Sequence, residues 1–293
     1  ENSLLDSCTN YKLYVDKAVE LGQTAIAFTE HGNTYNNIEK KMYANKNGLK
    51  YLHGVEIYLT ETLNEKIRDN YHTILIAKNY EGVKEINLLV DKSTRDDHAY
   101  YKPRISFDEF LQISDNVIKI SACLASPLNK YPSSVNKTYE DIKVLEQEKP
   151  DGFEQQIELL KVKIENAKQM YEQLLQKYDY YEIQPHVNSL EQIKYNQMLY
   201  EASKLYNKPL IAGTDTHSIN KYKAECRSIL QKAKRIEFAN EDDIVVCPLC
   251  GTPHHRDCYK KNGECGNYDK HNEGFRWAPS VENKRATEDT APL

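Results

Sequence analysis

Short β-rich runs alternate with amphipathic helical patterns through the first 237 residues of this 293-residue chain. Within the helical patterns, apolar residues recur three or four positions apart, as they do on the buried face of a helix. Strands and helices that alternate in this order form a parallel sheet, which is either open or closed into a barrel. The expected strands are 24–29, 51–59, 72–77, 117–121, 180–184 and 209–213, and the expected helices are 11–21, 36–44, 80–91, 190–205 and 221–233.

Two segments interrupt this pattern. Residues 128–178 contain a polar stretch and then a long helix rich in Glu, Gln and Lys, which we interpret as an insertion with a solvated helix face. After Phe238 a segment rich in Cys and His leads into a polar tail, 281–293, which we expect to be disordered. We therefore place a domain boundary near 238–243.

The composition argues against several classes of protein. No stretch approaches the roughly 18 to 20 uninterrupted apolar residues of a membrane span, and no basic segment followed by an apolar run marks a signal peptide. We therefore expect a cytoplasmic chain with no membrane partner. A net charge of −5 and a pI near 6.0 argue against a protein that coats nucleic acid through bulk positive charge, but they are compatible with a local phosphate site. The chain begins with Glu1 rather than Met, which indicates processing or a fragment.

Metal-binding residue types recur at or near the ends of the expected strands. They are Glu30, His31, Glu56, His72, Cys123, His186, Asp215 and His217. Because the carboxyl ends of parallel strands meet on one face, residues distant in sequence would gather there. Imidazole and carboxylate together suit Zn²⁺, Mn²⁺ or Fe²⁺, and several ions close together suit phosphoester hydrolysis. Each residue taken alone is as readily structural, and we interpret His53 and His98 as structural or surface residues.

Seven ordered motifs carry a resemblance to a known family. They are SLLD at 3–6, AFTEHGN at 27–33, HGVEIY at 53–58, HTILIAKNYEG at 72–82, YYKPRI at 100–105, SACLA at 121–125 and AGTDTHS at 212–218. Over 1–237, apart from the insertion, the chain resembles the polymerase and histidinol phosphatase (PHP) domain. The version at the N-terminus of bacterial DNA polymerase III alpha subunits is the most similar.

The resemblance implies a fold and a set of metal ligands. The fold would be a distorted seven-stranded β/α barrel that holds up to three ions, Zn²⁺, Mn²⁺ or both. The ligands implied are Asp6, His31, Glu56, His72, Cys123, Asp215 and His217. Glu30 replaces the usual Asp of the family and is not expected to be a ligand. The strand ending in His-x-His with which the family opens is missing from this sequence, so we expect a truncated first strand, fewer ions and impaired activity.

The resemblance also implies a function. It is a metal-dependent phosphoesterase of the 3′ to 5′ exonuclease type, acting on a DNA 3′ end beside the remainder of a replicase. A metal-bound hydroxide would be the nucleophile, and Arg104 is a candidate phosphate contact. No polymerase palm is expected after residue 238. Two alternatives remain open, namely a non-catalytic structural or interaction module and a free-standing histidinol-phosphatase-like phosphomonoesterase.

The segment 241–280 resembles part of a prokaryotic RING-finger-type zinc module. Its candidate zinc ligands are Cys247, Cys250, His255, Cys258, Cys265 and His271. A Cys-x-x-Cys pair presents two thiolates from one tight turn, and tetrahedral zinc needs four such ligands. Two arrangements remain open, because Cys247 and Cys250 could share an ion either with Cys265 and His271 or with His255 and Cys258. Whether this module is a natural fusion or a chimera also remains open.

Overall fold

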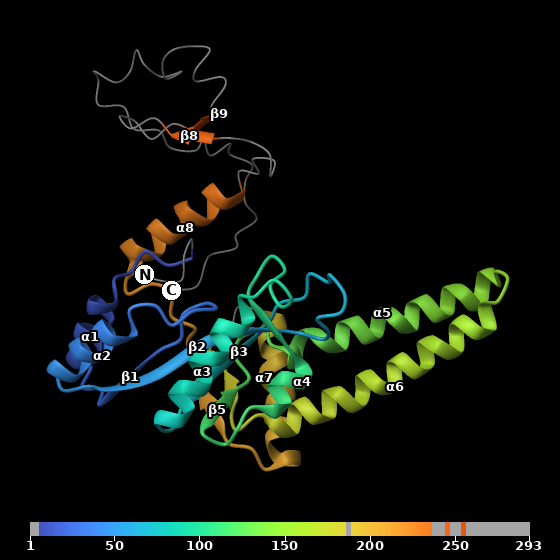
Figure 1. The fold of residues 1–293 in the computed structure, drawn as a ribbon, viewed down its shortest axis with the longest axis horizontal. Helices are drawn as coiled ribbons and strands as arrows, with labels where there is room; N and C mark the ends of the chain where they lie inside the picture. Colours follow the sequence, from blue (N-terminus) through green and yellow to red (C-terminus); the bar gives the residue numbers. More distant parts are fainter. Residues whose placement is uncertain (1–5, 186–188, 236–243, 247–252, 256–293) are drawn as a thin grey trace. The chain divides into compact units, whose positions relative to one another are not determined.

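The chain divides into two compact units, 1–219 and 220–293. The computed structural model describes residues 6–185, 189–235, 244–246 and 253–255 (Figure 1). The division falls upstream of the boundary expected near 238–243, so helix α8 (Lys221–Arg235) belongs to the second unit.

The first unit is built on two sheets. The larger contains β1 (Ala25–Phe28), β2 (Lys50–Thr60), β3 (Tyr71–Ala77), β4 (Arg104–Ser106) and β5 (Val117–Ile120), and the smaller contains β6 (Tyr181–Ile183) and β7 (Leu210–Ala212). The larger sheet has the order β1-β2-β3-β5, with β4 parallel to the second half of β2. A single bridge between Ile120 and Tyr180 joins β5 to the start of the smaller, parallel sheet.

The expectation of a purely parallel sheet is wrong at β3. This strand pairs antiparallel with both β2 and β5, so that Tyr58 lies opposite His72. Only residues 61–70 connect β2 to β3, and a parallel return needs a crossover of about a dozen residues or more. A closed seven-stranded barrel is not formed by the described residues, since the strands of the first unit stay divided between the two sheets.

Four helices pack beside the larger sheet, and a fifth follows β6. They are α1 (Tyr11–Glu20), α2 (Asn37–Lys46), α3 (Tyr80–Ser93), α4 (Phe107–Gln112) and α7 (Leu190–Tyr206). Local sequence fixes the starts of three of them: the side chains of Asn10 and Asn79 cap α1 and α3, and Ser106 with Glu109 forms a capping box on α4. The main core lies between the larger sheet and these helices, and a smaller cluster around Val15 holds α1 and α2 together.

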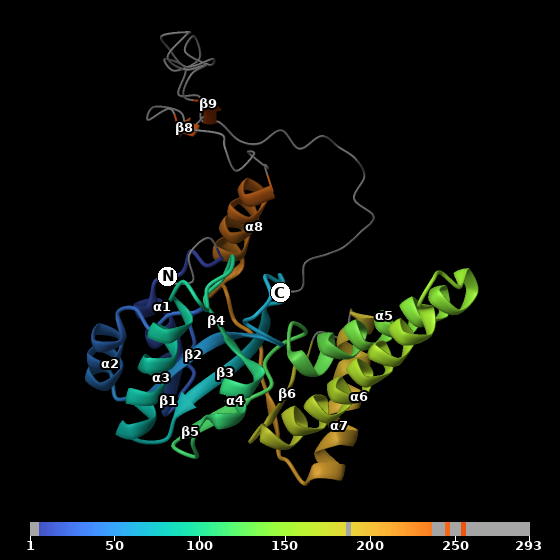
Figure 2. The same cartoon turned by 45° about the vertical axis from the view of Figure 1, so that its right-hand side comes forward.

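The insertion is a helical hairpin of α5 (Pro127–Glu148) and α6 (Phe153–Lys177), which projects from the sheets in both views (Figures 1 and 2). The stretch expected to be merely polar is therefore helical as well. A cluster of Ile142, Ile157 and Ile164 holds the two helices together. At the base, the Tyr178 hydroxyl lies 2.6 Å from Thr73 Oγ1 of β3, so the hairpin is anchored in the main core.

In the second unit the described residues form α8 and a short hairpin of β8 (Ile244–Val246) and β9 (Pro253–His255). Of the expected zinc ligands, His255 lies in β9 without a described side chain, and the five others lie outside the described residues, as does the 281–293 tail. None of the helices in the described ranges is long and apolar enough to cross a membrane.

Candidate metal centre

The seven residues expected to bind metal gather at one edge of the first unit. Asp6 precedes α1, His31 follows β1, Glu56 lies in β2, His72 is near the start of β3, Cys123 follows β5, and Asp215 and His217 follow β7. The antiparallel direction of β3 explains why a residue near the start of a strand meets residues that follow other strands. His186, also singled out in the sequence, lies outside the described residues.

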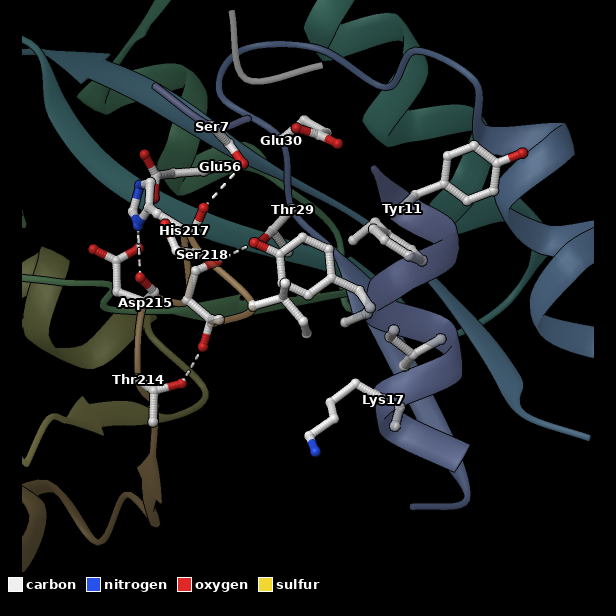
Figure 3. A pocket seen from close by; sticks show the side chains of 18 of the residues that line it. Ser7, Tyr11, Lys17, Thr29, Glu30, Glu56, Thr214, Asp215, His217 and Ser218 are labelled. Atoms are coloured by element: carbon white, nitrogen blue, oxygen red, sulfur yellow. Dashed lines mark hydrogen bonds and ion pairs between the residues drawn. The ribbon is translucent and has the colours of Figure 1, made fainter. Parts of the chain in front are cut away.

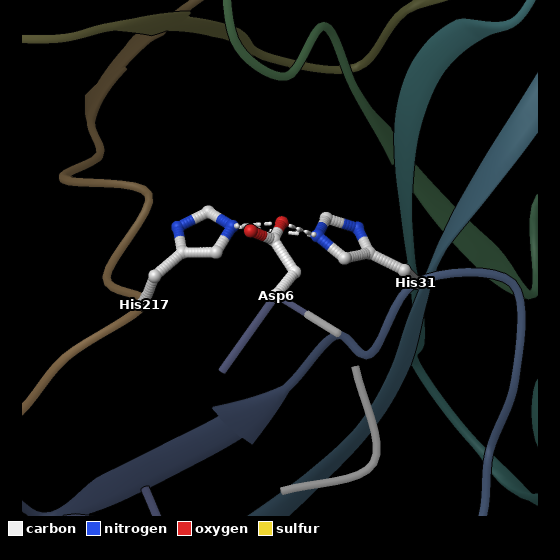
Figure 4. Close-up of side chains that lie close together, drawn as sticks. All are labelled: Asp6, His31 and His217. Carbon is white, nitrogen blue, oxygen red and sulfur yellow. Dashed lines mark hydrogen bonds and ion pairs between the residues drawn. The ribbon is translucent and has the colours of Figure 1, made fainter. Parts of the chain in front are cut away.

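Asp6, His31 and His217 form the centre of this gathering. Asp6 Oδ2 lies 2.9 Å from His31 Nε2 and 3.3 Å from His217 Nε2, and the two Nε2 atoms are 3.3 Å apart. Figure 4 shows the carboxylate between the two imidazole rings. One potential ligand atom from each residue lies within 4.8 Å of the others.

Glu56 joins His31 to His72. Its Oε1 lies 2.6 Å from His31 Nδ1 and 2.9 Å from His72 Nδ1. Burial disfavours the charged carboxylate, but hydrogen bonds from the two rings prevail and lower the pKa of Glu56 to about 2. Burial likewise opposes the charge on His31, yet Asp6 and Glu56 raise the pKa of its imidazole to about 10. The two groups therefore form a tightly coupled ion pair.

Cys123 and Asp215 extend the cluster, Cys123 beside His72 and Asp215 beside His217. Cys123 Sγ lies 3.7 Å from His72 Nδ1, and burial, with the nearby Asp215 and Glu56 carboxylates, raises the pKa of the thiol to about 12. Burial also raises the pKa of Asp215, whose main-chain oxygen lies 2.6 Å from His217 Nδ1. Ala122 and Asp215 adopt left-handed backbone conformations, with φ of 59° and 47°. Such conformations in residues other than glycine are concentrated at functional sites.

Two residues of this region were not predicted from the sequence. Glu182 in β6 is 5% exposed, accepts a hydrogen bond from Gln184 Nε2 at 2.9 Å, and has its pKa raised by burial. The Tyr58 ring lies against the rings of His31 and His72, with centroid distances of 6.3 and 5.1 Å. A charged residue inside the expected strand 180–184 was a usable signal for Glu182, whereas an aromatic residue in a strand such as Tyr58 carries none.

Arg104 does not lie in the cluster. It is 2% exposed, donates from its guanidinium to the main-chain oxygens of Ile67 and His98, and lies 3.6 Å from Asp69 Oδ1. These contacts occupy Nε and Nη1 and argue against a phosphate contact, which stays a prediction. His53 has a structural environment, as expected, between the Tyr51 hydroxyl and the Asn87 side chain.

A cavity of about 540 Å³ opens beside the cluster. One wall comes from α1 and β1, including Tyr11 and Lys17, and another from the loop that follows β7 (Figure 3). His31, Glu56, Asp215 and His217 line it. This volume is within the usual range of small-molecule sites, about 300 to 1,000 Å³.

The donor set suits a divalent cation. Nδ1 of His31 faces a carboxylate and Nδ1 of His217 faces a carbonyl, so each Nδ1 is the natural position of the ring proton. When His31 is neutral, both Nε2 lone pairs and the Asp6 carboxylate converge as three acceptors with no donor among them. A bound cation satisfies all three, and the partners at Nδ1 fix the orientation of the rings.

Comparison with known proteins supports both resemblances found in the sequence. The PHP domain family matches residues 1–186, and prokaryotic RING finger family 1 matches 220–278. The DNA polymerase III subunit alpha of Chlamydia pneumoniae is 27% identical over 270 residues, covering 89% of this chain and 21% of the relative. The corresponding subunit of Borreliella burgdorferi is 28% identical over 251 residues, covering 84% and 18%.

The chain thus spans about a fifth of the length of these curated relatives. Among solved structures, a protein described as a metal-dependent phosphoesterase of Bifidobacterium adolescentis is 12% identical, with a TM-score of 0.32. That alignment covers 74% of this chain and 86% of the other.

Proposed function

Because the chain belongs to the PHP domain family, we propose that its first unit is a metal-dependent phosphoesterase that removes nucleotides from a DNA 3′ end. The observation that carries this proposal is the convergence of Asp6 Oδ2 and the Nε2 atoms of His31 and His217 beside an open cavity. The DNA polymerase III relatives favour DNA as the substrate and the remainder of a replicase as the partner.

The residues of the site bind metal or orient the ligands, and Glu56 is a candidate for both roles. Asp6, His31 and His217 would hold one ion, and Glu56, His72, Cys123 and Asp215 are the candidate ligands for a further one. Bound Zn²⁺ or Mn²⁺ supplies Lewis acidity toward a phosphoryl oxygen and activates water near neutral pH. Glu56 and the Asp215 carbonyl orient the rings of His31 and His217 through their Nδ1 atoms. The cavity gives a phosphoester access to this edge of the sheet.

Shortening of a 5′-labelled single-stranded DNA in the presence of Mn²⁺ or Zn²⁺ tests the proposal directly. We expect stepwise loss from the 3′ end, abolished by chelation and by His217→Asn. His53→Gln is the matched control, since it changes a histidine of the same unit that faces Tyr51 and Asn87, and it should keep the activity. Release of phosphate from a monoester without DNA shortening would instead indicate the phosphomonoesterase alternative.

A non-catalytic module is the second candidate, favoured by one observation. Protonated His31 pairs through Nε2 with Asp6 and through Nδ1 with Glu56, so both carboxylates have a cationic partner without a metal. In that case the protein would be inert toward both substrates.

We also propose that a strand ending in His-x-His would add ligands to this centre. An added N-terminal strand ending in His-x-His would supply two more imidazoles, so we expect it to raise both the number of bound ions and the rate of DNA shortening. Elemental analysis of the two proteins, purified without chelator, measures the first quantity. Equal metal content and equal rates would contradict the added ligands.

For the second unit we propose zinc binding through its cysteine and histidine residues. The match to prokaryotic RING finger family 1 and the Cys247–Cys250 spacing support this. We expect the paired substitution Cys247→Ser and Cys250→Ser to lower the zinc content of the chain. Unchanged zinc content would contradict the proposed ligands.

A further inference from the structure

Lys40 in the first turn of α2 is a buried cation beside the loop that carries His31. Its side chain is 1% exposed, and its Nζ lies 2.6 Å from Glu30 Oε1 and 5.2 Å from the ring centroid of Phe28. Lysine is almost never fully buried unless its charge is paired, because removing the charge from water is costly. Glu30 directly precedes His31, so this buried pair lies beside a candidate metal ligand.

The main chain of Glu30 is part of the frame that holds His31 opposite Glu56. The Glu30 carbonyl accepts a hydrogen bond from the Glu56 amide at 3.0 Å, and the Gly32 amide donates to the Glu56 carbonyl at 2.8 Å. These two bonds flank His31, whose Nδ1 lies 2.6 Å from Glu56 Oε1. A contact that fixes Glu30 therefore also fixes His31 relative to Glu56.

Lys40 also holds the Glu30 carboxylate in place beside the metal centre. Glu30 lines the same cavity as His31 and His217. With Lys40 absent, the charge of Glu30 would be left buried without this partner, and its carboxylate would turn toward water. Lys40 and Ala44 are the two buried residues of α2, so the ion pair also ties this helix to the loop.

We propose that Lys40 is a positioning residue, which together with Glu30 holds the His31 loop in the geometry that binds the metal ion. The inference rests on the proposed function, since it takes Asp6, His31 and His217 as the metal centre. Loss of a polar partner that orients a metal ligand commonly lowers metal affinity about 10- to 100-fold, and we expect a loss of that size for Lys40→Met.

Mn²⁺ titration of the full chain tests this inference, with the free aqueous ion followed by electron paramagnetic resonance. Mn²⁺ is chosen because carboxylate-containing sites accept it, whereas the thiolates of the second unit favour zinc. Lys40→Arg keeps the charge and should retain most of the affinity that Lys40→Met loses. Circular dichroism establishes that each variant is folded.

Lys119→Met is the matched control. Lys119 is also a buried lysine of the first unit, and its Nζ lies 3.2 Å from Asp179 Oδ2 and 3.4 Å from the Ser114 carbonyl, without contact to the metal centre. We expect it to lower stability and leave Mn²⁺ affinity unchanged.

The outcomes separate the two proposals. If the unsubstituted chain binds no Mn²⁺, the metal centre itself is refuted. If it binds Mn²⁺ and folded Lys40→Met binds equally well, the role of Lys40 is refuted while the centre stands. Should Lys40→Met fail to fold, Glu30→Gln removes the partner charge at nearly constant volume. Unchanged Mn²⁺ affinity in that variant would likewise refute the inference.

Discussion

At the scale of single residues, His31 shows why the candidate centre could be predicted in part. The motif at 27–33 identified His31 as a candidate ligand. Its partners Asp6 and Glu56, however, belong to other parts of the chain. Lys40 was missed for the same reason, because a lysine in a polar helix ordinarily faces water and only the fold brings it against Glu30. Residue types at strand ends were predictable, whereas the partners that orient them depend on tertiary packing.

Gly213, directly after β7, yields a prediction at this scale. A Cβ added there would lie 2.1 Å from Glu182 Oε1, so Gly213→Ala must displace the buried carboxylate. We expect a loss of about 1 to 3 kcal/mol in the free energy of unfolding, typical of overpacking. Urea denaturation measures it. In the background of Glu182→Ala the same substitution should cost much less, and an equal cost in both backgrounds would contradict the steric explanation.

At the scale of elements, periodicity predicted six strands and five helices close to their observed positions. α4 was missed because six residues are too few to show a helical period, and β4 was missed because its three residues include only one apolar residue, Ile105. The direction of β3 depends on the connection 61–70, which is too short for the crossover that a parallel return needs. In α5, Pro132 and several polar residues hid a helix that is stabilised by packing against α6.

The anchor of the α5/α6 hairpin can be tested at its base. Tyr178→Phe removes the hydroxyl that lies 2.6 Å from Thr73 Oγ1, leaving a buried polar group without this partner. We expect a loss of about 1 to 3 kcal/mol in unfolding free energy, measured by urea denaturation. The double variant Tyr178→Phe with Thr73→Val should be less destabilised than the sum of the single variants. Additive losses would show that the two hydroxyls do not interact.

The capping box of α4 predicts a pH dependence. Burial opposes the charge of Glu109, but hydrogen bonds from Lys92 and His98 prevail and lower its pKa from 4.5 to about 2. Because the folded pKa lies below the unfolded value, this contribution is present above about pH 4.5 and is lost as the pH falls toward 2. Glu109→Gln should therefore be less stable than the unsubstituted chain at pH 7, with the difference shrinking through that acid range. Urea denaturation at a series of pH values checks this.

Glu81→Gln is the control for that experiment. Its carboxylate forms an exposed pair with Lys84, three residues along α3, and such pairs contribute little to stability. A shrinking difference of the same size in both variants would point to a general effect of acid and away from the capping box.

At the scale of the whole molecule, ion binding should couple to the stability of the first unit. A ligand that binds only the folded state adds about 2.7 kcal/mol at a concentration 100-fold above its Kd. We therefore expect Mn²⁺ at that excess to raise the Tm of the first unit by several degrees in a calorimetric scan. His217→Asn should abolish the increase, and a rise that persists in this variant would place the ion elsewhere.

The contact between the two ends of the first unit has a mechanical consequence. The Ser7 hydroxyl donates to the His217 carbonyl at 3.0 Å across 210 residues of chain, and Asp6 meets the ring of the same histidine. These contacts close a long loop of chain, and the entropic cost of closing such a loop grows only with the logarithm of its length. A force that pulls the two ends apart would act on this contact first. An ion bound there would therefore be a reversible cross-link between the two ends.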